Sequence, residues 1–312
     1  MGFVGLGSQG LPMARRIVDA GFPTTLWARR AESLEPFAGS AAAIAESPAA
    51  LGAVSDLLCI CVVSDRDVQQ VLSGRDGAMH AMAPGSIVVI HSTVHPDTCR
   101  RLQAARPELH VIDGPVSGGA GRASEGELLV MLGGDGVVIE RCRPVLETFG
   151  NPIVHVGELG AAQEAKLLNN TVFTAQLELA TEVFEIAAAR GLDREAVAKI
   201  LSNGSGQSFA ADLVAAFGFS LESLSGMTAS LLTKDVSIFA DVTGVGRTPM
   251  VVAAEGALSR MGVTELPRGD VWTATSDTLR FSGSRRRWPT RLLGARDAIL
   301  CSAMSGVGRF SA

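Results

Sequence analysis

Two patterns of hydrophobic and polar positions divide the chain, and they change near residue 158. In the first part, short apolar runs alternate with segments of helical period. The runs at 56–63 and 86–90 are almost continuously apolar, which is typical of strands buried on both faces of a parallel sheet. Further short runs occur at 1–6, 24–28, 128–132 and 152–156. We therefore expect an α/β sheet of seven or eight mostly parallel strands over residues 1–158.

The second part begins with a long segment between Gly160 and Gly191 that contains no Pro and no internal Gly. Strong helix formers dominate it, so we expect one helix of about eight turns, ~45 Å long. Its apolar residues fall around much of the circumference, which predicts burial on most sides. After it only helical patterns follow, until they weaken at about residue 265. The pattern predicts an all-α C-terminal domain over 159–312, joined to the first domain by this interdomain helix and ending in an irregular tail.

Length and composition narrow the class of protein. A chain of 312 residues suits two domains, 1–158 and 159–312. No apolar run is long enough to span a bilayer, so we expect no membrane partner. A net charge of −5 argues against a general nucleic-acid partner. No secretory signal is evident, and the five cysteines are an odd number at scattered positions, which fits a cytoplasmic, reducing location.

A glycine motif, Gly5-Leu6-Gly7-Ser8-Gln9-Gly10, lies between the first predicted strand and a helical segment. In this context Gly5 would allow a tight turn, Gly7 would admit phosphates to the backbone, and Gly10 would let helix and strand pack closely. The N-terminus of the helix would then face a pyrophosphate. The alternative is a glycine turn that only connects strand to helix. We predict a dinucleotide site that includes Ser8 and Gln9.

The second predicted strand ends in Arg29 and Arg30, about twenty residues after the glycines. An NAD site usually has an acidic residue there for the ribose 2′-hydroxyl, whereas guanidinium groups suit a 2′-phosphate. A solvated turn is the alternative, and we predict a preference for NADP over NAD. Loops at the carboxyl ends of later strands also contact ligands in such sheets, so we add Val63, Ser64 and Thr93 to the cofactor site.

Other polar residues at strand ends fall into two groups. Ser117, Gly118 and Gly119 follow a strand near 111–113, and their unhindered N–H groups and hydroxyl could cradle a carboxylate. His91 and His95 follow the strand at 86–90, where we expect them to orient loops rather than react. Cys59 and Cys61 would share one side of a strand, but without further ligands nearby we assign them to the core and expect no metal.

Candidate acid–base chemistry converges on the long helix. The chain has no Tyr and only three lysines, at 166, 199 and 234, and every histidine lies at or before His155. Lys166 and Asn170 form an i,i+4 pair at the start of an otherwise apolar helix. Burial on such a helix would lower the pKa of Lys166 toward neutrality. A polar pair at this place in an apolar helix therefore makes Lys166 and Asn170 candidates for a functional site.

Taken together, these segments resemble the β-hydroxyacid dehydrogenases, the 3-hydroxyisobutyrate dehydrogenase-like family. The resemblance covers about residues 2–262 and rests on the ordered motifs GFVGLGSQGLPMA, IVVIHST, DGPVSGGAGRASEG, GELGAAQEAKLLNN and LLTKD. It implies a Rossmann-type first domain, an all-helical second domain and catalysis by Lys166. It also implies that Ser117, Gly118, Gly119 and Asn170 hold the substrate, with Lys234 near both the substrate carboxylate and the nicotinamide.

The expected reaction is hydride transfer between NAD(P) and a small 3-hydroxy acid or its semialdehyde. Two alternatives remain: an imine reductase-like NADPH enzyme, which shares the two-domain plan, and a non-catalytic NADPH-binding protein. Apolar surface in excess of what a domain of about 150 residues can cover predicts a homodimer or homotetramer. The Arg-rich tail, which includes Arg285–Arg287, is interpreted as a solvated end.

Overall fold

The computed structural model describes residues 1–264, and a nine-stranded sheet forms the first part of them. The order β3-β2-β1-β4-β5-β6 is parallel throughout, as in dinucleotide-binding folds; β8 then runs antiparallel to β6 and β7 and parallel to β9. The expected count of seven or eight strands is therefore too low, because the two-residue strands β3 and β7 leave no apolar run to recognise. The strands are β1 Gly2–Val4, β2 Thr25–Trp27, β3 Ala43–Ile44, β4 Leu57–Ile60, β5 Ile87–Ile90, β6 His110–Asp113, β7 Val116–Ser117, β8 Leu128–Gly133 and β9 Gly150–Gly157.

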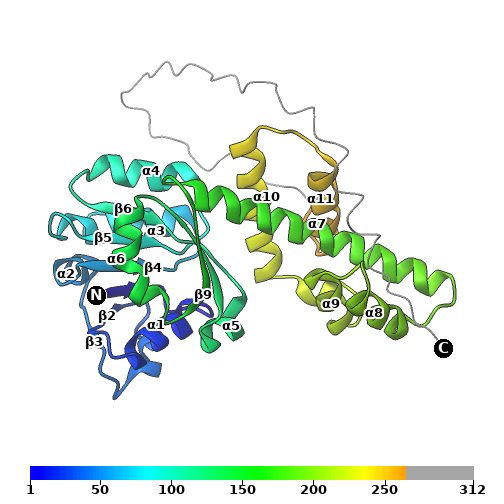
Figure 1. Cartoon of the computed structure of the whole chain (residues 1–312), viewed down its shortest axis with the longest axis horizontal. Helices are drawn as coiled ribbons and strands as arrows, with labels where there is room; N and C mark the ends of the chain where they lie inside the picture. The colour runs from blue at the N-terminus through cyan, green and yellow to red at the C-terminus, as the bar shows by residue number, and fades with distance from the viewer. Residues whose placement is uncertain (265–312) are drawn as a thin grey trace, which may run out of the picture. The chain divides into compact units, whose positions relative to one another are not determined.

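Helices cover both faces of this sheet (Figure 1). Side chains alternate along β4, so that Cys59 enters one core while Leu58 and Ile60 enter the other. Cys61 packs against the same core as Cys59, as expected for small core residues. The first core includes α1 Gly10–Asp19, α5 Gly119–Glu125 and α6 Gly136–Leu146; the second includes α2 Pro48–Ala53, α3 Asp65–Ser73 and α4 Pro96–Ala105; the short helices η1 Ala31–Phe37 and η2 Ala78–His80 complete this part.

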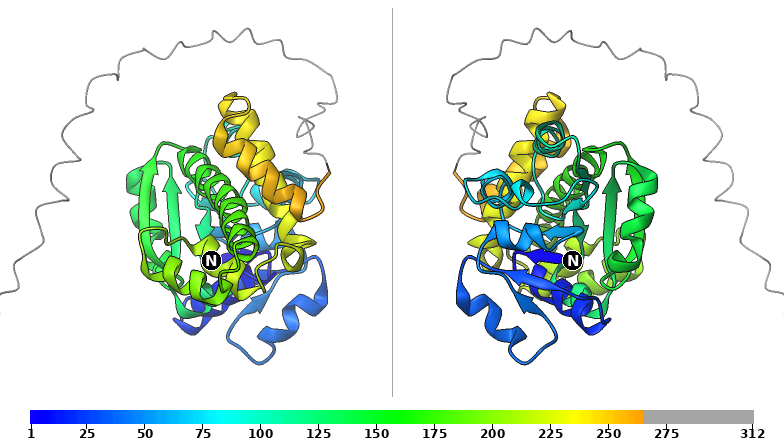
Figure 2. Two further views of the ribbon diagram at one scale, coloured as in Figure 1. Left: turned by 90° about the vertical axis from the view of Figure 1, so that its right-hand side faces the viewer. Right: turned by 90° about the vertical axis from the view of Figure 1, so that its left-hand side faces the viewer.

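From residue 158 to the end of the described chain, all regular structure is helical, which confirms the predicted fold class. The long helix α7 Ala161–Ala189 packs against α9, α10 and α11, and its N-terminal part contacts β8 and β9. Figure 2 shows α10 and α11 side by side. The sequence pattern did not predict α9 or α11. The remaining helices are α8 Arg194–Asn203, α9 Phe209–Ala216, η3 Glu222–Leu224, α10 Met227–Thr243 and α11 Pro249–Arg260.

The expectation that α7 is buried on most sides is wrong. Leu177 and Phe184 are buried, but Leu179, Val183 and Ile186 are exposed. Much of the buried face consists instead of Ala and Thr. Small side chains at a helix contact allow the axes to approach closely, which fits the packing of α7 against its neighbouring helices.

Residues 1–264 belong to one compact unit, and the domain boundary placed at residue 158 stays a prediction. The tail expected to be irregular after about residue 265 lies outside the described residues, together with Arg285–Arg287. None of the helices in the described part is long and apolar enough to cross a membrane.

Candidate functional site

The glycine motif between β1 and α1 has the backbone geometry that the sequence predicts. Gly5 has φ +94°, and a Cβ there would lie 2.0 Å from the carbonyl oxygen of Cys61. A Cβ on Gly10 would lie 1.9 Å from the carbonyl oxygen of Gly5. At Gly7, by contrast, a Cβ would meet nothing within 4 Å. Gly5 and Gly10 are therefore needed for close packing, while the approach to Gly7 and the N-terminus of α1 is open to a ligand.

A pocket of about 440 Å³ lies at this loop. Five of the predicted cofactor residues line it: Gly5, Gly7, Arg29, Arg30 and Val63. The Arg29 guanidinium also lies 3.4 Å from the carboxylate of Asp67, another residue of the pocket wall. Arg75 lines the same pocket from the loop after α3. Sequence reasoning missed Arg75, since nothing in its spacing from the glycines marks it.

Other predicted cofactor residues lie outside this lining: Ser8, Gln9, Gly10, Ser64, Thr93 and Lys234. Ser64 caps α3, where its hydroxyl donates to the Asp67 carboxylate (2.7 Å) and accepts from the Asp67 backbone N–H (3.2 Å). That local role explains the residue without a cofactor. Thr93 instead belongs to the lysine cluster described next.

Lys166 is buried on α7, with 7% of its surface exposed. Burial lowers its pKa to about 8; the negative charge of Asp235 works in the opposite direction, and the positive charge of Lys234 lowers the pKa further. An amine in this range exchanges protons near neutral pH, unlike an ordinary lysine. The lowered pKa that the sequence predicts for Lys166 is present.

Asp235 joins the predicted residues of α7 and α10. The Asn170 amide nitrogen donates to one oxygen of its carboxylate (2.5 Å), and the Lys234 ammonium lies 2.9 Å from the other. The same ammonium donates to the carbonyl oxygen of Thr93, in the loop after β5. The structure therefore brings together Asn170, Lys234 and Thr93. Asp235 was missed as a functional residue, although it stands next to Lys234 in the motif LLTKD.

The predicted carboxylate cradle lies at the end of β7. Ser117 pairs with Leu129 of β8, and Gly118 and Gly119 have φ values of +136° and +72° as the chain turns into α5. Positive φ at two successive residues requires glycine and leaves their N–H groups unshielded by side chains. No hydrogen bond or ion pair found within residues 1–264 joins this cradle to the lysine cluster.

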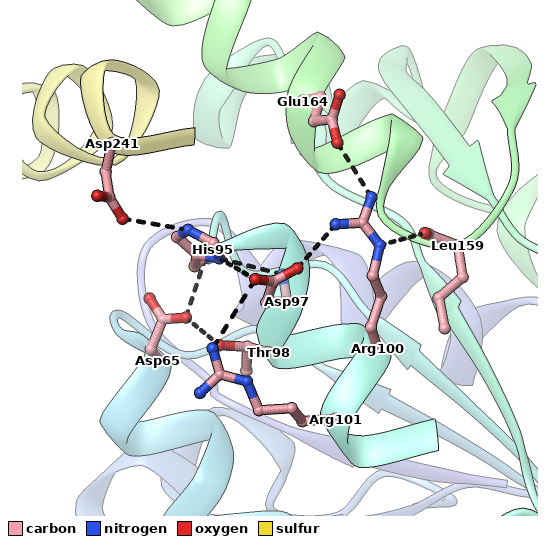
Figure 3. A network of polar contacts seen from close by, with 9 residues as sticks. All are labelled: Asp65, His95, Asp97, Thr98, Arg100, Arg101, Leu159, Glu164 and Asp241. Carbon is pink, nitrogen blue, oxygen red and sulfur yellow. Dashed lines mark hydrogen bonds and ion pairs between the residues drawn. The ribbon is translucent and has the colours of Figure 1, made fainter. Parts of the chain in front are cut away.

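The two histidines after β5 hold loops in place. His91 is buried, its Nδ1 lies 2.7 Å from the carbonyl oxygen of Gly114, and burial lowers its pKa to about 4 in spite of that bond. His95 Nε2 lies 3.3 Å from the Asp241 carboxylate on α10, and its backbone N–H donates to Asp65 (2.9 Å). Figure 3 shows His95 within a network that ties the β5–α4 loop to neighbouring helices. Both contacts fit the expected orienting role.

The start of α7 is fixed by Asp113, at the carboxyl end of β6. Its two carboxylate oxygens accept from the backbone N–H groups of Gly160 and Gln163, both at 2.8 Å. Burial raises the pKa of Asp113, and these hydrogen bonds act against that shift. The strand that leads to the Ser117 cradle is thus bonded directly to the first turn of the helix that bears Lys166.

Known families match both parts of the chain. Residues 1–157 match the family described as the NAD binding domain of 6-phosphogluconate dehydrogenase. Residues 160–264 match the family described as NAD-binding of NADP-dependent 3-hydroxyisobutyrate dehydrogenase. The two matches cover almost all described residues, including the glycine loop and the lysine cluster.

The chain is also similar in sequence to individual oxidoreductases. An uncharacterized oxidoreductase of Mycobacterium tuberculosis is 36% identical over 203 residues, 64% of this chain and 68% of that protein. The NAD-dependent L-serine dehydrogenase of Pseudomonas aeruginosa is 29% identical over 259 residues, 80% of this chain and 87% of that protein.

Solved structures show the same fold. The 3-hydroxyisobutyrate dehydrogenase of Mycobacterium tuberculosis, solved with L-serine, superposes with a TM-score of 0.71 and 26% identity, covering 81% of this chain and 90% of that one. An imine reductase from Myxococcus stipitatus in complex with NADP⁺ reaches a TM-score of 0.57 over 84% and 92% of the two chains. At 19% identity, that second likeness is one of fold alone.

Proposed function

The chain belongs to the β-hydroxyacid dehydrogenases, a family of NAD(P)-dependent oxidoreductases, and from this premise we propose that it transfers a hydride between NADP(H) and a small 3-hydroxy acid. The substrate would be 3-hydroxyisobutyrate or a similar acid, and the oxidised partner its semialdehyde. The observation that carries the proposal is the buried Lys166, whose pKa is lowered to about 8 on the same helix as Asn170.

The glycine loop fits a dinucleotide. Gly7 leaves room for phosphates, and the N–H groups that begin α1 would stabilise their charge. Arg29 and Arg30 line the same pocket, where guanidinium groups would bind a ribose 2′-phosphate. When bound, the nicotinamide supplies or accepts the hydride.

Lys166 is proposed to exchange the proton of the substrate hydroxyl. In the direction of oxidation the neutral amine accepts this proton, and in the direction of reduction the ammonium donates it. The lowered pKa supports both uses, because each form is then populated near neutral pH. Burial also excludes water, so the proton is exchanged with the substrate rather than directly with solvent.

Asn170 and the cradle are proposed to hold the substrate. One N–H of the Asn170 amide donates to Asp235, which fixes the amide so that its second N–H can meet the substrate hydroxyl. The N–H groups of Gly118 and Gly119, with the Ser117 hydroxyl, would bind the carboxylate. This assignment stays a prediction for each of these residues.

The alternatives receive less support. An imine reductase shares the fold, but a carboxylate cradle has no use in a reaction whose substrate carries no carboxylate. A non-catalytic NADPH-binding protein gives no reason to bury an amine beside Asn170. Turnover of NADPH with methylmalonic or succinic semialdehyde separates the three functions.

The first test is a substrate panel with the purified protein and both cofactors. The acids named in relatives supply it: 3-hydroxyisobutyrate, L-serine, 2-(hydroxymethyl)glutarate and L-threonate. We expect reduction of NADP⁺ with at least one of them. Absence of turnover with all four, and with both semialdehydes, would refute the proposed function.

The second test concerns Lys166. Lys166→Ala should lower kcat by about 10²–10⁴-fold, the usual contribution of a positioned acid or base, with cofactor affinity nearly unchanged. Lys166→Arg should restore little, because a guanidinium keeps its proton at working pH. Lys234→Ala should mainly raise KM. If Lys166→Ala keeps kcat within about tenfold while Lys234→Ala abolishes it, the roles of the two lysines are reversed.

A further inference from the structure

Gln163 is a fully buried amide on the first turn of α7, with 0% of its surface exposed. Its Oε1 accepts from the backbone N–H of Val94 (3.0 Å), and its Nε2 donates to the carbonyl oxygen of Ser92 (2.9 Å). Both polar atoms of the Gln163 amide are therefore hydrogen-bonded to the backbone of the β5–α4 loop. A buried amide without these partners would be strongly unfavourable, so the two bonds fix the distance between helix and loop.

Thr93 is the residue between these two bonds, and its carbonyl oxygen accepts from Lys234. The loop is thus held from α7 on both sides of Thr93 and from α10 at Thr93 itself. Gln163 also precedes Lys166 by three residues, which puts the two side chains on adjacent turns of one helix face. A shift of Gln163 against the loop would move Lys166 relative to Thr93.

We propose that Gln163 is a positioning residue, which holds the helix that bears Lys166 in register with the Ser92–Val94 loop. This register keeps the proton carrier aligned with the substrate and the nicotinamide during hydride transfer. The proposal rests on the proposed function, under which Lys166 exchanges the proton of the substrate; the loop at Thr93 is the one to which Lys234 is bonded. Reaction rates fall by about 10²-fold for misplacements of about 1 Å, so a small shift at this contact affects kcat before it affects binding.

The chain supplies a matched control. Gln103 on α4, a half-buried residue, makes a similar reciprocal pair of backbone bonds: its Nε2 donates to Leu109 (2.8 Å) and its Oε1 accepts from Val111 (2.8 Å). That amide connects α4 to the start of β6 and touches none of the proposed site. A loss of stability should be common to both positions, whereas a loss of alignment belongs to Gln163 alone.

The experiment compares Gln163→Glu with Gln103→Glu in the full-length protein. A carboxylate at position 163 keeps the acceptor for Val94 but turns an oxygen toward the Ser92 carbonyl. We expect kcat to fall about 100-fold at pH 8, with the Kd for NADPH within threefold of the parent. Protonation restores a donor, so the ratio of variant to parent kcat should rise as the pH is lowered. Gln103→Glu should keep kcat within threefold.

Three results would overturn the proposal: an unchanged kcat in Gln163→Glu, an equal fall in both variants, or a fall in NADPH affinity as large as the fall in kcat. Should Gln163→Glu not fold, Gln163→Asn gives the same comparison, because its neutral amide is one methylene too short to reach the loop.

A readout independent of activity separates this proposal from the proposed function. The Val94 amide should resist hydrogen exchange in the parent and lose that protection in Gln163→Asn, whose side chain is too short to reach the loop, whereas Gln163→Glu keeps an acceptor for it. A parent without turnover but with a protected Val94 would refute the function alone. A parent with turnover whose Val94 amide exchanges equally fast in the variant would refute the positioning role.

Discussion

The charge state of Lys166 depends on burial and on two neighbours of opposite sign. Burial lowers its pKa to about 8, Asp235 opposes the shift and Lys234 adds to it. At pH 7 an ordinary lysine is almost wholly protonated, whereas a pKa of about 8 leaves about a tenth of the molecules with a neutral amine. Burial outweighs the attraction of Asp235, and for a proton carrier that is the useful outcome.

This balance predicts a pH dependence. Oxidation requires the neutral amine, so its kcat should rise as the pH passes through the pKa of Lys166, near 8, while kcat for reduction should fall. Asp235→Asn removes the charge that raises this pKa, and the inflection should move to lower pH. Lys234→Ala removes the charge that lowers it, and the inflection should move to higher pH. Profiles of kcat against pH measure both.

Lys199→Ala is the control for these profiles, because Lys199 is an exposed lysine on α8 and should leave the inflection where it is. Shifts of Asp235→Asn and Lys234→Ala in the same direction would contradict the electrostatic account.

Sequence reasoning reached Lys166 because lysine is rare in this chain and the residue begins an apolar helix. It did not reach Asp235, because the partner of a carboxylate on α10 depends on how that helix packs against α7. Gln163 escaped notice for the same reason: its partners, Ser92 and Val94, are about seventy residues away. Local chemistry is visible in a sequence, whereas contacts between distant segments are not.

At the scale of elements, the glycine loop was predicted in detail, whereas α7 was predicted in its extent but not in its burial. The roles of Gly5 and Gly10 follow from steric limits between neighbouring segments, which the motif itself specifies. The extent of α7 also followed from composition. Its buried face did not, because burial depends on which side the other helices occupy, and they occupy the side rich in Ala and Thr.

The end of β2 predicts the choice of cofactor. Arg30 lines the dinucleotide pocket, while Arg29 is already paired with Asp67. A charged hydrogen bond to a 2′-phosphate contributes about 1.5–3 kcal/mol, or about ten- to a hundredfold in affinity. We expect tighter binding of NADPH than of NADH, and in Arg30→Ala a loss of at least tenfold for NADPH alone. Titration of the purified protein with each cofactor measures both.

Arg66→Ala is the matched control, since this exposed arginine on α3 does not line the pocket. Equal or tighter binding of NADH by the parent would overturn the assigned preference.

At the scale of the whole described molecule, contacts between distant segments assemble the candidate site. Asp113 bonds the sheet to the start of α7, Lys234 bonds α10 to the loop at Thr93, and His95 pairs with Asp241. Each contact joins residues at least 47 positions apart, and the Lys234 contact spans 141. The resemblance to a known family implied that Lys166, Asn170 and Lys234 belong to one site, but it did not predict the contacts that Asp113, Thr93, His95 and Asp241 make around it.

The exposed face of α7 leads us to predict a homo-oligomer. Five large apolar side chains of α7 are between 39% and 55% exposed: Leu168, Val172, Leu179, Val183 and Ile186. At 100° per residue they fall within one narrow stripe, ~27 Å long. Exposed apolar residues that share one stripe of a helix favour an interaction surface. A second copy of the chain is the partner we expect, as a homodimer or homotetramer.

Leu179→Glu and Ile186→Glu should weaken this association, because each places a charge where a burial worth about 1.5–3 kcal/mol per side chain is lost in both subunits. The dissociation constant should rise about 100-fold or more. Light scattering at micromolar concentration measures the change. Leu192→Glu is the control, since Leu192 is 57% exposed but lies beyond the end of α7. A parent that is a clean monomer, or a Leu192→Glu variant that dissociates as readily as Leu179→Glu, would show that the stripe does not hold copies of the chain together.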